Sequence, residues 1–112
     1  MEVIAGAGQY ARPDATGATY VEQLRTADLS VGTYSLTAGA EDRQSPHTED
    51  EVYVVTSGRA KFTSGGVTID VGPGSVFFVP ALESHRFHDI AEDLAVLVFF
   101  GPAERTRAAG AR

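Results

Sequence analysis

Hydrophobic residues in this chain recur mainly at every second position or in short bursts, and the three- and four-residue spacing of an amphipathic helix is nearly absent. The stretch LSVGTYSL at 29–36 alternates clearly, which places Val31 and Thr33 on the face opposite to Tyr34. Such alternation is typical of a β-strand with one buried face. We expect strands at 20–24, 29–36, 51–55, 60–63, 67–71, 76–79, 85–87 and 94–100.

Turn-forming residues separate these segments, for example SGG at 64–66 and GPG at 72–74. Short strands about ten residues apart, with turns between them, are typical of a β-sandwich or barrel. The last burst, LAVLVFF at 94–100, is apolar on both faces, so we expect a strand that is buried on both sides or covered by a partner. Periodicity alone leaves a buried helix open for this segment, but its β-branched and aromatic residues favour a strand.

Length and composition indicate one globular domain. A chain of 112 residues suffices for a single core, and 43% hydrophobic with 21% charged residues argues against intrinsic disorder. We expect an N-terminal arm at 1–18, a barrel at 19–102 and a flexible tail at 103–112. Because the chain has no cysteine, disulfides and thiolate metal ligands are excluded.

The net charge of -6 narrows the class of partner. The nine basic residues are scattered, so the basic stripe that a nucleic-acid binder needs is missing. No stretch is apolar enough for a membrane span, and the first residues lack a basic region followed by an apolar run. We expect a cytoplasmic protein that handles a small-molecule substrate and binds neither nucleic acid nor membrane.

The chain has three histidines, and one of them lies in a segment that favours metal binding. His47 and Glu51 flank the turn Thr-Glu-Asp, so neighbouring antiparallel strands about 5 Å apart could bring the two groups together. An imidazole nitrogen with a carboxylate oxygen suits iron, zinc, manganese, nickel or cobalt, and a second histidine would complete a two-histidine, one-carboxylate site with open positions. A polar turn between two strands is the plain structural alternative.

A spaced set of residues surrounds this segment. Gly39 is followed after five residues by Ser45, then by His47, by Glu51 and, six residues further on, by Gly58. This order resembles the first motif of the cupin superfamily, which reads Gly, five residues, His-x-His, three or four residues, Glu, six residues, Gly. Every spacing fits, and Ser45 stands where the family motif has its first histidine.

A second spaced set follows. Gly74 is followed after five residues by Pro80, then by Leu82, by His85 and by Asp89. This order resembles the second cupin motif, which reads Gly, five residues, Pro-x-Gly, two residues, His, three residues, Asn. Leu82 replaces the motif's glycine and Asp89 its asparagine. Both motifs occur in order across residues 39–89, just under half of the chain.

The resemblance implies an all-β, single-domain cupin barrel, which is a double-stranded β-helix or jelly roll, of the small conserved-barrel type (cupin 2). It implies that His47, Glu51 and His85 hold a divalent transition metal, iron first, with zinc, manganese or nickel as alternatives. The strand pattern agrees, because His85 and Phe87 share a face while His88 points the other way, outside the metal site. Neither argument names a catalytic residue.

The serine in place of a histidine leaves three alternatives. Ser45 could hold a metal-bound water by a hydrogen bond, and we expect this one. Gln44 or Asp42 could replace the missing ligand, although strand alternation around Ser45 would turn Gln44 away from the site. Alternatively, the site could be free of metal and bind an organic ligand through His47, His85 and nearby tyrosines.

Residues with the strand parity of Glu51 should line the barrel behind the metal. Glu49 and Asp50 fall in the turn before Glu51, where solvated charge is the ordinary expectation. A largely apolar wall would suit a small, partly hydrophobic organic molecule. We expect the wall to be formed by Tyr53, Val55, Phe77, Val79, Phe87 and Phe99.

These observations predict a metal-dependent enzyme that acts on a small organic molecule, with oxygenase chemistry if iron is bound. Lewis-acid chemistry, such as isomerisation, cyclisation or a lyase reaction, is the alternative for other metals. A non-catalytic barrel that binds a small ligand is a further alternative. Because Val52 and Val54 should point outward from the barrel, we also expect a homodimer.

Overall fold

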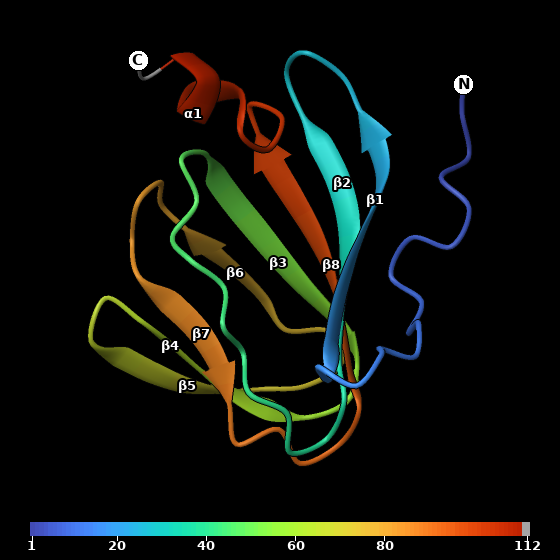
Figure 1. Ribbon diagram of the computed structural model, residues 1–112, viewed down its shortest axis with the longest axis vertical. Coiled ribbons are helices and arrows are strands. Elements are labelled where there is room, and N and C mark those ends of the chain that lie inside the picture. Colours follow the sequence, from blue (N-terminus) through green and yellow to red (C-terminus); the bar gives the residue numbers. More distant parts are fainter. Residues whose placement is uncertain (111–112) are drawn as a thin grey trace.

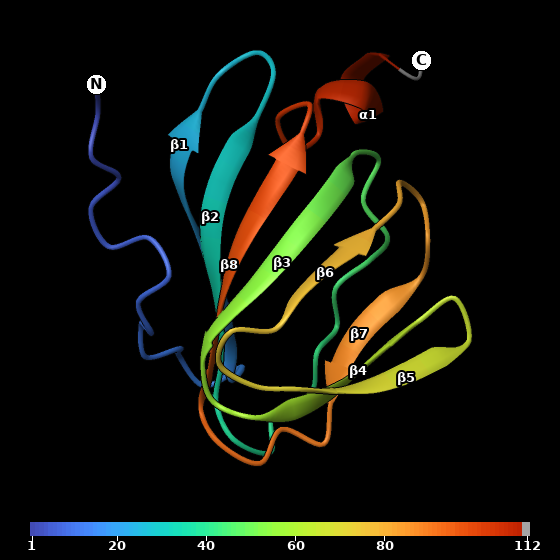
Figure 2. The ribbon, with the colours of Figure 1, turned by 180° about the vertical axis from the view of Figure 1, so that it is seen from behind.

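The computed structural model describes residues 1–110, which form two antiparallel β-sheets that face each other around one core (Figures 1 and 2). The strand order in the larger sheet is β1-β2-β8-β3-β6, and in the smaller sheet it is β5-β4-β7. The strands are β1 (Ala18–Arg25), β2 (Ser30–Leu36), β3 (Asp50–Ser57), β4 (Ala60–Ser64), β5 (Val67–Val71), β6 (Val76–Val79), β7 (His85–His88) and β8 (Leu94–Gly101).

Each of the predicted strands is present, with bounds that differ by no more than a few residues. The last burst of apolar residues forms β8, which pairs with β2 on one side and with β3 on the other. Its central place in the larger sheet explains why Leu94, Ala95 and Val96 are all fully buried although they point to alternating faces.

The core lies between the two sheets and is rich in aromatic rings. Tyr53 on β3 packs against Phe62 on β4 and Phe87 on β7, with ring centroids 5.5 and 5.4 Å apart. Phe62 and Phe87 are themselves 4.7 Å apart. Burial of one such side chain stabilises a fold by roughly 1.5–3 kcal/mol, so this cluster is a main contact that holds the sheets together.

The N-terminal arm lies against the outer face of the larger sheet. The N–H of Gly8 donates to Oγ1 of Thr33 at 2.8 Å, and the N–H of Ala11 donates to Oγ of Ser35 at 3.1 Å. Thr33 and Ser35 point away from the core, yet both are buried because the arm covers them. The arm therefore belongs to the folded unit, while the division of the chain at residue 18 stays a prediction.

The connection between β2 and β3, residues 37–49, crosses from one sheet toward the other beside β7 (Figure 1). It contains no strand, and its place is set by contacts with β7 and its flanks. The carboxylate of Asp42 accepts the N–H of Phe87 at 2.8 Å, and the N–H of Leu82 donates to the carbonyl of His47 at 2.7 Å. These contacts bring the segment that carries His47 close to the start of β7.

Residues 103–110 of the predicted flexible tail form a turn and the short helix α1 (Thr106–Gly110), close to the end of β8 (Figure 1). Glu49, which we expected to be solvated, is only 1% exposed and accepts the N–H groups of Arg105 and Arg107 at 2.6 and 2.8 Å. Burial raises the pKa of Glu49, but these bonds and one from Thr48 lower it below its ordinary value overall. Glu49 is thus a buried anchor for this segment, whose flexibility stays a prediction.

Within residues 1–110, no helix has the length and apolar character needed to cross a membrane.

Candidate metal centre

The three residues that the motifs predicted as metal ligands lie together in space. His47 lies near the end of the connection between β2 and β3, Glu51 is the second residue of β3, and His85 is the first residue of β7. One potential ligand atom from each of them lies within 4.8 Å of the others. The group joins both sheets and could hold a metal ion.

The ring of His85 is oriented like that of a metal ligand. Its Nδ1 lies 2.8 Å from the carbonyl oxygen of Glu83, and its Nε2 lies 3.0 Å from Oε1 of Glu51. A carbonyl oxygen can only accept, so Nδ1 carries a proton and the ring directs Nε2 toward Glu51 and the site. An Nδ1–H bond to a carbonyl is a common arrangement behind metal-bound histidines, because it fixes the tautomer and the ring.

The electrostatics of this pair favour a positive charge at the site. Burial lowers the pKa of His85, but the hydrogen bonds to Glu51 and to the Glu83 carbonyl, with the charge of Glu51, raise it above its ordinary value overall. Within the described part of the chain, the buried Oε2 of Glu51 has no hydrogen-bond partner. A buried carboxylate oxygen without a partner is costly, and a bound cation would satisfy it. The residues present therefore fit a metal ion.

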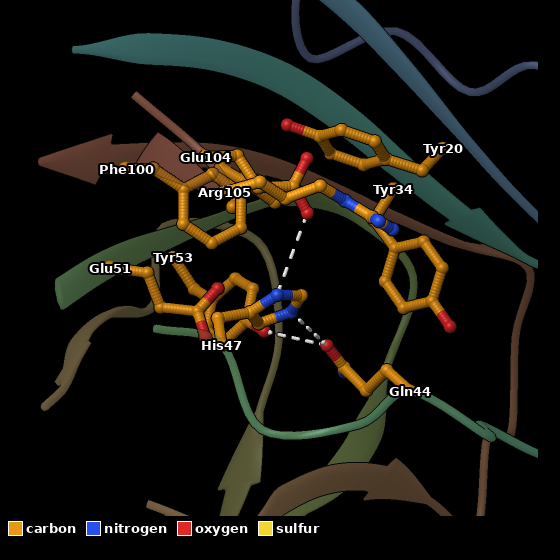
Figure 3. Close-up of a pocket in the computed structure, with 10 residues that line it drawn as sticks. Tyr20, Tyr34, Gln44, His47, Glu51, Tyr53, Phe100, Glu104 and Arg105 are labelled. Carbon is orange, nitrogen blue, oxygen red and sulfur yellow. Dashed lines mark hydrogen bonds and ion pairs between the residues drawn. The ribbon is translucent and has the colours of Figure 1, made fainter. Parts of the chain in front are cut away.

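His47, the second histidine of the group, also lines the pocket. Nδ1 of His47 lies 3.5 Å from Oε2 of Glu104, and its Nε2 lies 3.2 Å from Oε1 of Gln44 (Figure 3). The ring packs against Phe100 and His85, with centroids 4.8 and 5.4 Å away. The two histidine rings therefore converge with their Nε2 atoms toward the same amide oxygen.

A cavity of about 200 Å³ opens over this group (Figure 3). That volume is below the roughly 300–1,000 Å³ of pockets for drug-sized ligands, so it suits a small molecule. The lining combines residues from the larger sheet, from the connection between β2 and β3 and from the C-terminal segment: Tyr20, Tyr34, Gln44, His47, Glu51, Tyr53, Val98, Phe100, Glu104 and Arg105.

Two tyrosines keep their protons at the cavity wall. Burial raises the pKa of Tyr20 and of Tyr34 well above the ordinary phenol value, and nearby carboxylates raise both further. The hydroxyl of Tyr34 donates to Asp42 at 2.6 Å. The hydroxyl of Tyr20 is buried and has no hydrogen-bond partner in residues 1–110, so it is a free donor beside the cavity.

The C-terminal segment adds two charged groups that the sequence did not point to. Glu104 and Arg105 line the cavity, although the sequence placed them in a peripheral tail. Burial raises the pKa of Glu104 above its ordinary value, and His47 and Arg105 oppose this shift. No motif marks these residues, because contacts with residues distant in the chain, among them Glu49 and Ser30, bring the segment over the site.

Ser45 lies outside the cavity, and its neighbour Gln44 lies inside. The side chain of Ser45 is exposed, so its position does not support the expected role in holding a metal-bound water. Oε1 of Gln44 lies 3.1 Å from Nε2 of His85 and 3.1 Å from the hydroxyl of Tyr53. The expectation that Gln44 turns away was wrong, because residues 41–47 have no strand structure and strand alternation does not apply there.

The predicted pocket wall divides into three groups. Tyr53 lines the cavity, whereas Val55, Val79 and Phe87 are buried in the core and Phe77 packs against that core. Phe99 lies on the outer face of the larger sheet, and Phe100 takes its place in the cavity. The register decides this, because Phe100 pairs with Glu51 across β8 and β3 and so shares its face.

His88 lies apart from the metal group, as the strand pattern predicted. Its Nε2 is 2.7 Å from Oγ1 of Thr63, and its Nδ1 is 2.7 Å from Oδ2 of Asp89. Both ring nitrogens of His88 therefore form hydrogen bonds with Thr63 and Asp89.

The fold and the motifs agree with the family comparison. The family described as "Cupin domain" (Cupin_2) matches residues 32–100, so the chain belongs to the cupin family. The predicted cupin barrel is thereby confirmed.

Known relatives extend this comparison. An uncharacterized protein of Streptomyces coelicolor, SCO3923, is 52% identical over 90 residues, which cover 80% of this chain and 86% of that protein. The crystal structure of an RmlC-like cupin protein from Desulfovibrio desulfuricans has a TM-score of 0.75 at 19% identity and covers 92% of this chain and 98% of its own. Salicylate 1,2-dioxygenase from Pseudoaminobacter salicylatoxidans, solved in complex with gentisate, has a TM-score of 0.70 at 18% identity over 77% of this chain and 25% of the dioxygenase. At these identities the two structures show the fold alone.

Proposed function

We propose that this protein is a metal-dependent enzyme that acts on a small organic molecule, with iron as the metal and oxygenase chemistry as the reaction type. The observation that carries the proposal is the convergence of His47, His85 and Glu51 below a cavity of about 200 Å³. Two histidines and one carboxylate with open positions are the ligand set of many non-haem iron oxygenases. The cupin domain of salicylate 1,2-dioxygenase, which shares the fold, supports this choice by analogy.

Iron held by these residues would supply open positions at which a substrate and dioxygen bind next to each other. The chain itself would bind and orient the substrate. The free hydroxyl of Tyr20 can donate a hydrogen bond to a polar substrate group, and the guanidinium of Arg105 favours a substrate with a negative charge. Val98 and Phe100 form an apolar wall that limits the water in the cavity.

A Lewis-acid reaction, such as isomerisation or elimination, is the second candidate. It is favoured by ionisable groups beside the cavity, namely the phenol of Tyr20 and the carboxyl group of Glu104, and burial raises the pKa of both. Such groups suit proton transfer next to a bound metal. Dependence on dioxygen separates this reaction from the oxygenase.

The first test is metal content. Protein purified without a metal-affinity tag should contain close to one equivalent of iron, measured by mass spectrometry of the digested protein. The His47→Ala variant should lose it, whereas His88→Ala should retain it, because His88 lies outside the group. Absence of metal in all three proteins, including protein soaked in ferrous iron without oxygen, would contradict the proposal.

The second test is reactivity. Nitric oxide added to the ferrous protein should give the electron paramagnetic resonance signal of an iron nitrosyl if a coordination position is open. Dioxygen uptake with a panel of small phenolic and carboxylic acids should then identify the substrate class. Turnover without dioxygen uptake would favour the Lewis-acid reaction, and bound ligand without turnover would favour a binding protein.

The expected homodimer remains part of the proposal. The outer face of β3, β6 and β8 carries Val52, Val54, Val76, Phe78 and Phe99, with Asp50 at the start of β3, and Phe78 is 59% exposed. A contiguous apolar face of this kind is typical of a surface that binds another protein. A second copy of this chain would bury the same face on both sides.

A further inference from the structure

The side chain of Gln44 reaches between the two histidines of the metal centre. Its Oε1 is 3.2 Å from Nε2 of His47 and 3.1 Å from Nε2 of His85. Glu51 reaches the same histidine, His85, with Oε1 at 3.0 Å. Four potential ligand atoms from four residues therefore meet at one place.

The orientation of the Gln44 amide is fixed by a carboxylate. Its Nε2 donates to Oδ2 of Asp42 at 2.7 Å, and a carboxylate can only accept, so Oε1 must face the histidines. Asp42 is only 6% exposed and is itself held by the hydroxyl of Tyr34 and the N–H of Phe87. This anchored carboxylate acts on the amide as outer partners do on metal ligands, by fixing which atom faces the metal.

Oε1 of Gln44 lies among hydrogen-bonding groups, since both histidine Nε2 atoms contact it and the hydroxyl of Tyr53 donates to it at 3.1 Å. Nδ1 of His85 donates to the Glu83 carbonyl, which turns Nε2 toward Oε1 of Gln44 and Oε1 of Glu51. Nδ1 of His47 faces the carboxylate of Glu104 in the same manner, and its Nε2 faces Gln44. A divalent cation bound between these atoms would displace any proton on the Nε2 atoms, because histidine ligates a metal as the neutral imidazole.

The neighbouring residue offers no such group. Ser45 is exposed and lies in a depression outside the cavity, so its hydroxyl does not face Glu51 or the histidines. A neutral hydroxyl is also a weaker ligand than an amide oxygen for a divalent cation. The motif places the ligand at Ser45, but the neighbouring residue Gln44 is the one that contacts the histidines.

We propose that the amide oxygen of Gln44 is the fourth protein ligand of the metal, and that Asp42 positions this amide. The inference rests on the proposed function, since it requires a metal on His47, Glu51 and His85. It adds a ligand that the cupin motif does not contain. A site of two imidazoles, one carboxylate and one neutral amide oxygen offers only nitrogen and oxygen ligands, and it suits ferrous iron, cobalt or zinc.

The test compares cobalt(II) binding in four proteins: wild type, Gln44→Leu, Ser45→Ala and His47→Ala. Gln44→Leu keeps a similar side-chain volume without an oxygen, and it should bind cobalt at least about tenfold more weakly, in the range that losses near metal sites produce. Its visible absorption bands should also change in position and intensity, because these bands report the number and kind of ligands. Ser45→Ala should match wild type in both affinity and spectrum.

The outcomes separate this inference from the proposed function. If wild type binds no cobalt, the proposed function fails and the inference fails with it. If wild type binds and His47→Ala does not, but Gln44→Leu matches wild type, the metal site stands and the fourth ligand is overturned. Weaker binding of Gln44→Leu with an unchanged spectrum would also overturn it, because Gln44 would then act outside the coordination shell. The same holds if Ser45→Ala alone loses affinity.

A measurement on the wild-type protein covers the case in which Gln44→Leu does not fold. Zinc added to protein labelled with ¹³C and ¹⁵N should shift the side-chain carbonyl resonance of Gln44 and leave that of Gln23, which bonds Thr33 on the outer face, in place. Equal behaviour of both resonances under saturating zinc would contradict the proposal.

Discussion

Two departures from the cupin motifs have different consequences at the scale of single residues. Leu82 takes the place of a motif glycine and adopts φ of 69°, the left-handed conformation that glycine enters most easily. It is exposed, so the side chain meets no steric obstacle and only the backbone preference is disturbed. Ser45, by contrast, leaves a ligand position open, and Gln44 reaches the site in its place.

A glycine on β2 makes room for the tyrosine that reaches the cavity. A Cβ on Gly32 would overlap the phenol ring of Tyr20, which lies across it from β1. Gly32→Ala should therefore displace this ring and lower the free energy of unfolding by about 1–3 kcal/mol, as overpacking does. Urea denaturation measures this loss.

The double variant gives the control for this prediction. In a Tyr20→Ala background the obstacle is gone, so the penalty of Gly32→Ala should fall to about 0.5 kcal/mol or less, since alanine is no worse than glycine in a strand. An equal penalty in both backgrounds would show that Gly32 is needed for another reason.

At the scale of elements, the C-terminal segment depends on one buried carboxylate. Glu49 accepts the N–H groups of Arg105 and Arg107 and a bond from Thr48 Oγ1 at 2.5 Å. This arrangement helps to place the C-terminal segment so that Glu104 and Arg105 line the cavity. The N–H of Glu104 also donates to Oγ of Ser30 at 2.9 Å, so the start of the segment has a second attachment, while Arg105 and Arg107 depend on Glu49.

Glu49→Gln should loosen this segment while the barrel stays folded. The amide replaces one acceptor oxygen with a donor, which leaves an N–H group without a partner and costs about 1.5–3 kcal/mol, as for other bonds to charged groups. Amide hydrogen exchange at Arg105 and Arg107 should accelerate strongly. Glu41→Gln, at an exposed carboxylate, is the matched control and should leave both amides protected. Unchanged exchange in Glu49→Gln would contradict the anchor.

At the scale of the whole molecule, the metal centre joins the two sheets, because Glu51 belongs to β3 and His85 to β7. A cation bound only by the folded state stabilises that state by RT ln(1 + [L]/Kd), which is about 2.7 kcal/mol at one hundred times Kd. Metal binding should therefore raise the stability of the whole barrel.

Cobalt or zinc added to metal-stripped protein should raise its melting temperature by several degrees, since about 1 kcal/mol shifts a domain of this size by roughly 4–8 °C. Glu51→Gln should lose most of this rise because it removes the carboxylate charge. His88→Ala should keep it. A rise of equal size in Glu51→Gln would point to a different metal site.

The apolar outer face gives a prediction about assembly. Phe78→Glu introduces a charge on the exposed face of β6, an edge strand of the larger sheet, and should convert a dimer into monomers. Light scattering coupled to size exclusion measures the mass of each species. Val67→Glu, on the exposed surface of β5, is the control and should keep the mass of wild type. A monomeric wild-type protein would contradict the proposed homodimer.

The sequence by itself determined the strands, the faces of most of them and the three predicted metal ligands. Those features follow from period-two alternation and from short spacings, which are local properties of the chain. His47, Glu51 and His85 could be predicted because family motifs mark them and strand parity agrees for His85.

Only the tertiary structure decided which other groups surround the site. Gln44 reaches the site in place of Ser45 because the connection between β2 and β3 has no strand structure there. A hydrogen bond to Asp42 orients the Gln44 side chain. Phe100 replaces Phe99 because the pairing of β3 with β8 sets the parity, and Glu104 reaches the cavity because buried Glu49 anchors a distant segment. Each of these depends on contacts between residues far apart in the chain, which no local pattern encodes.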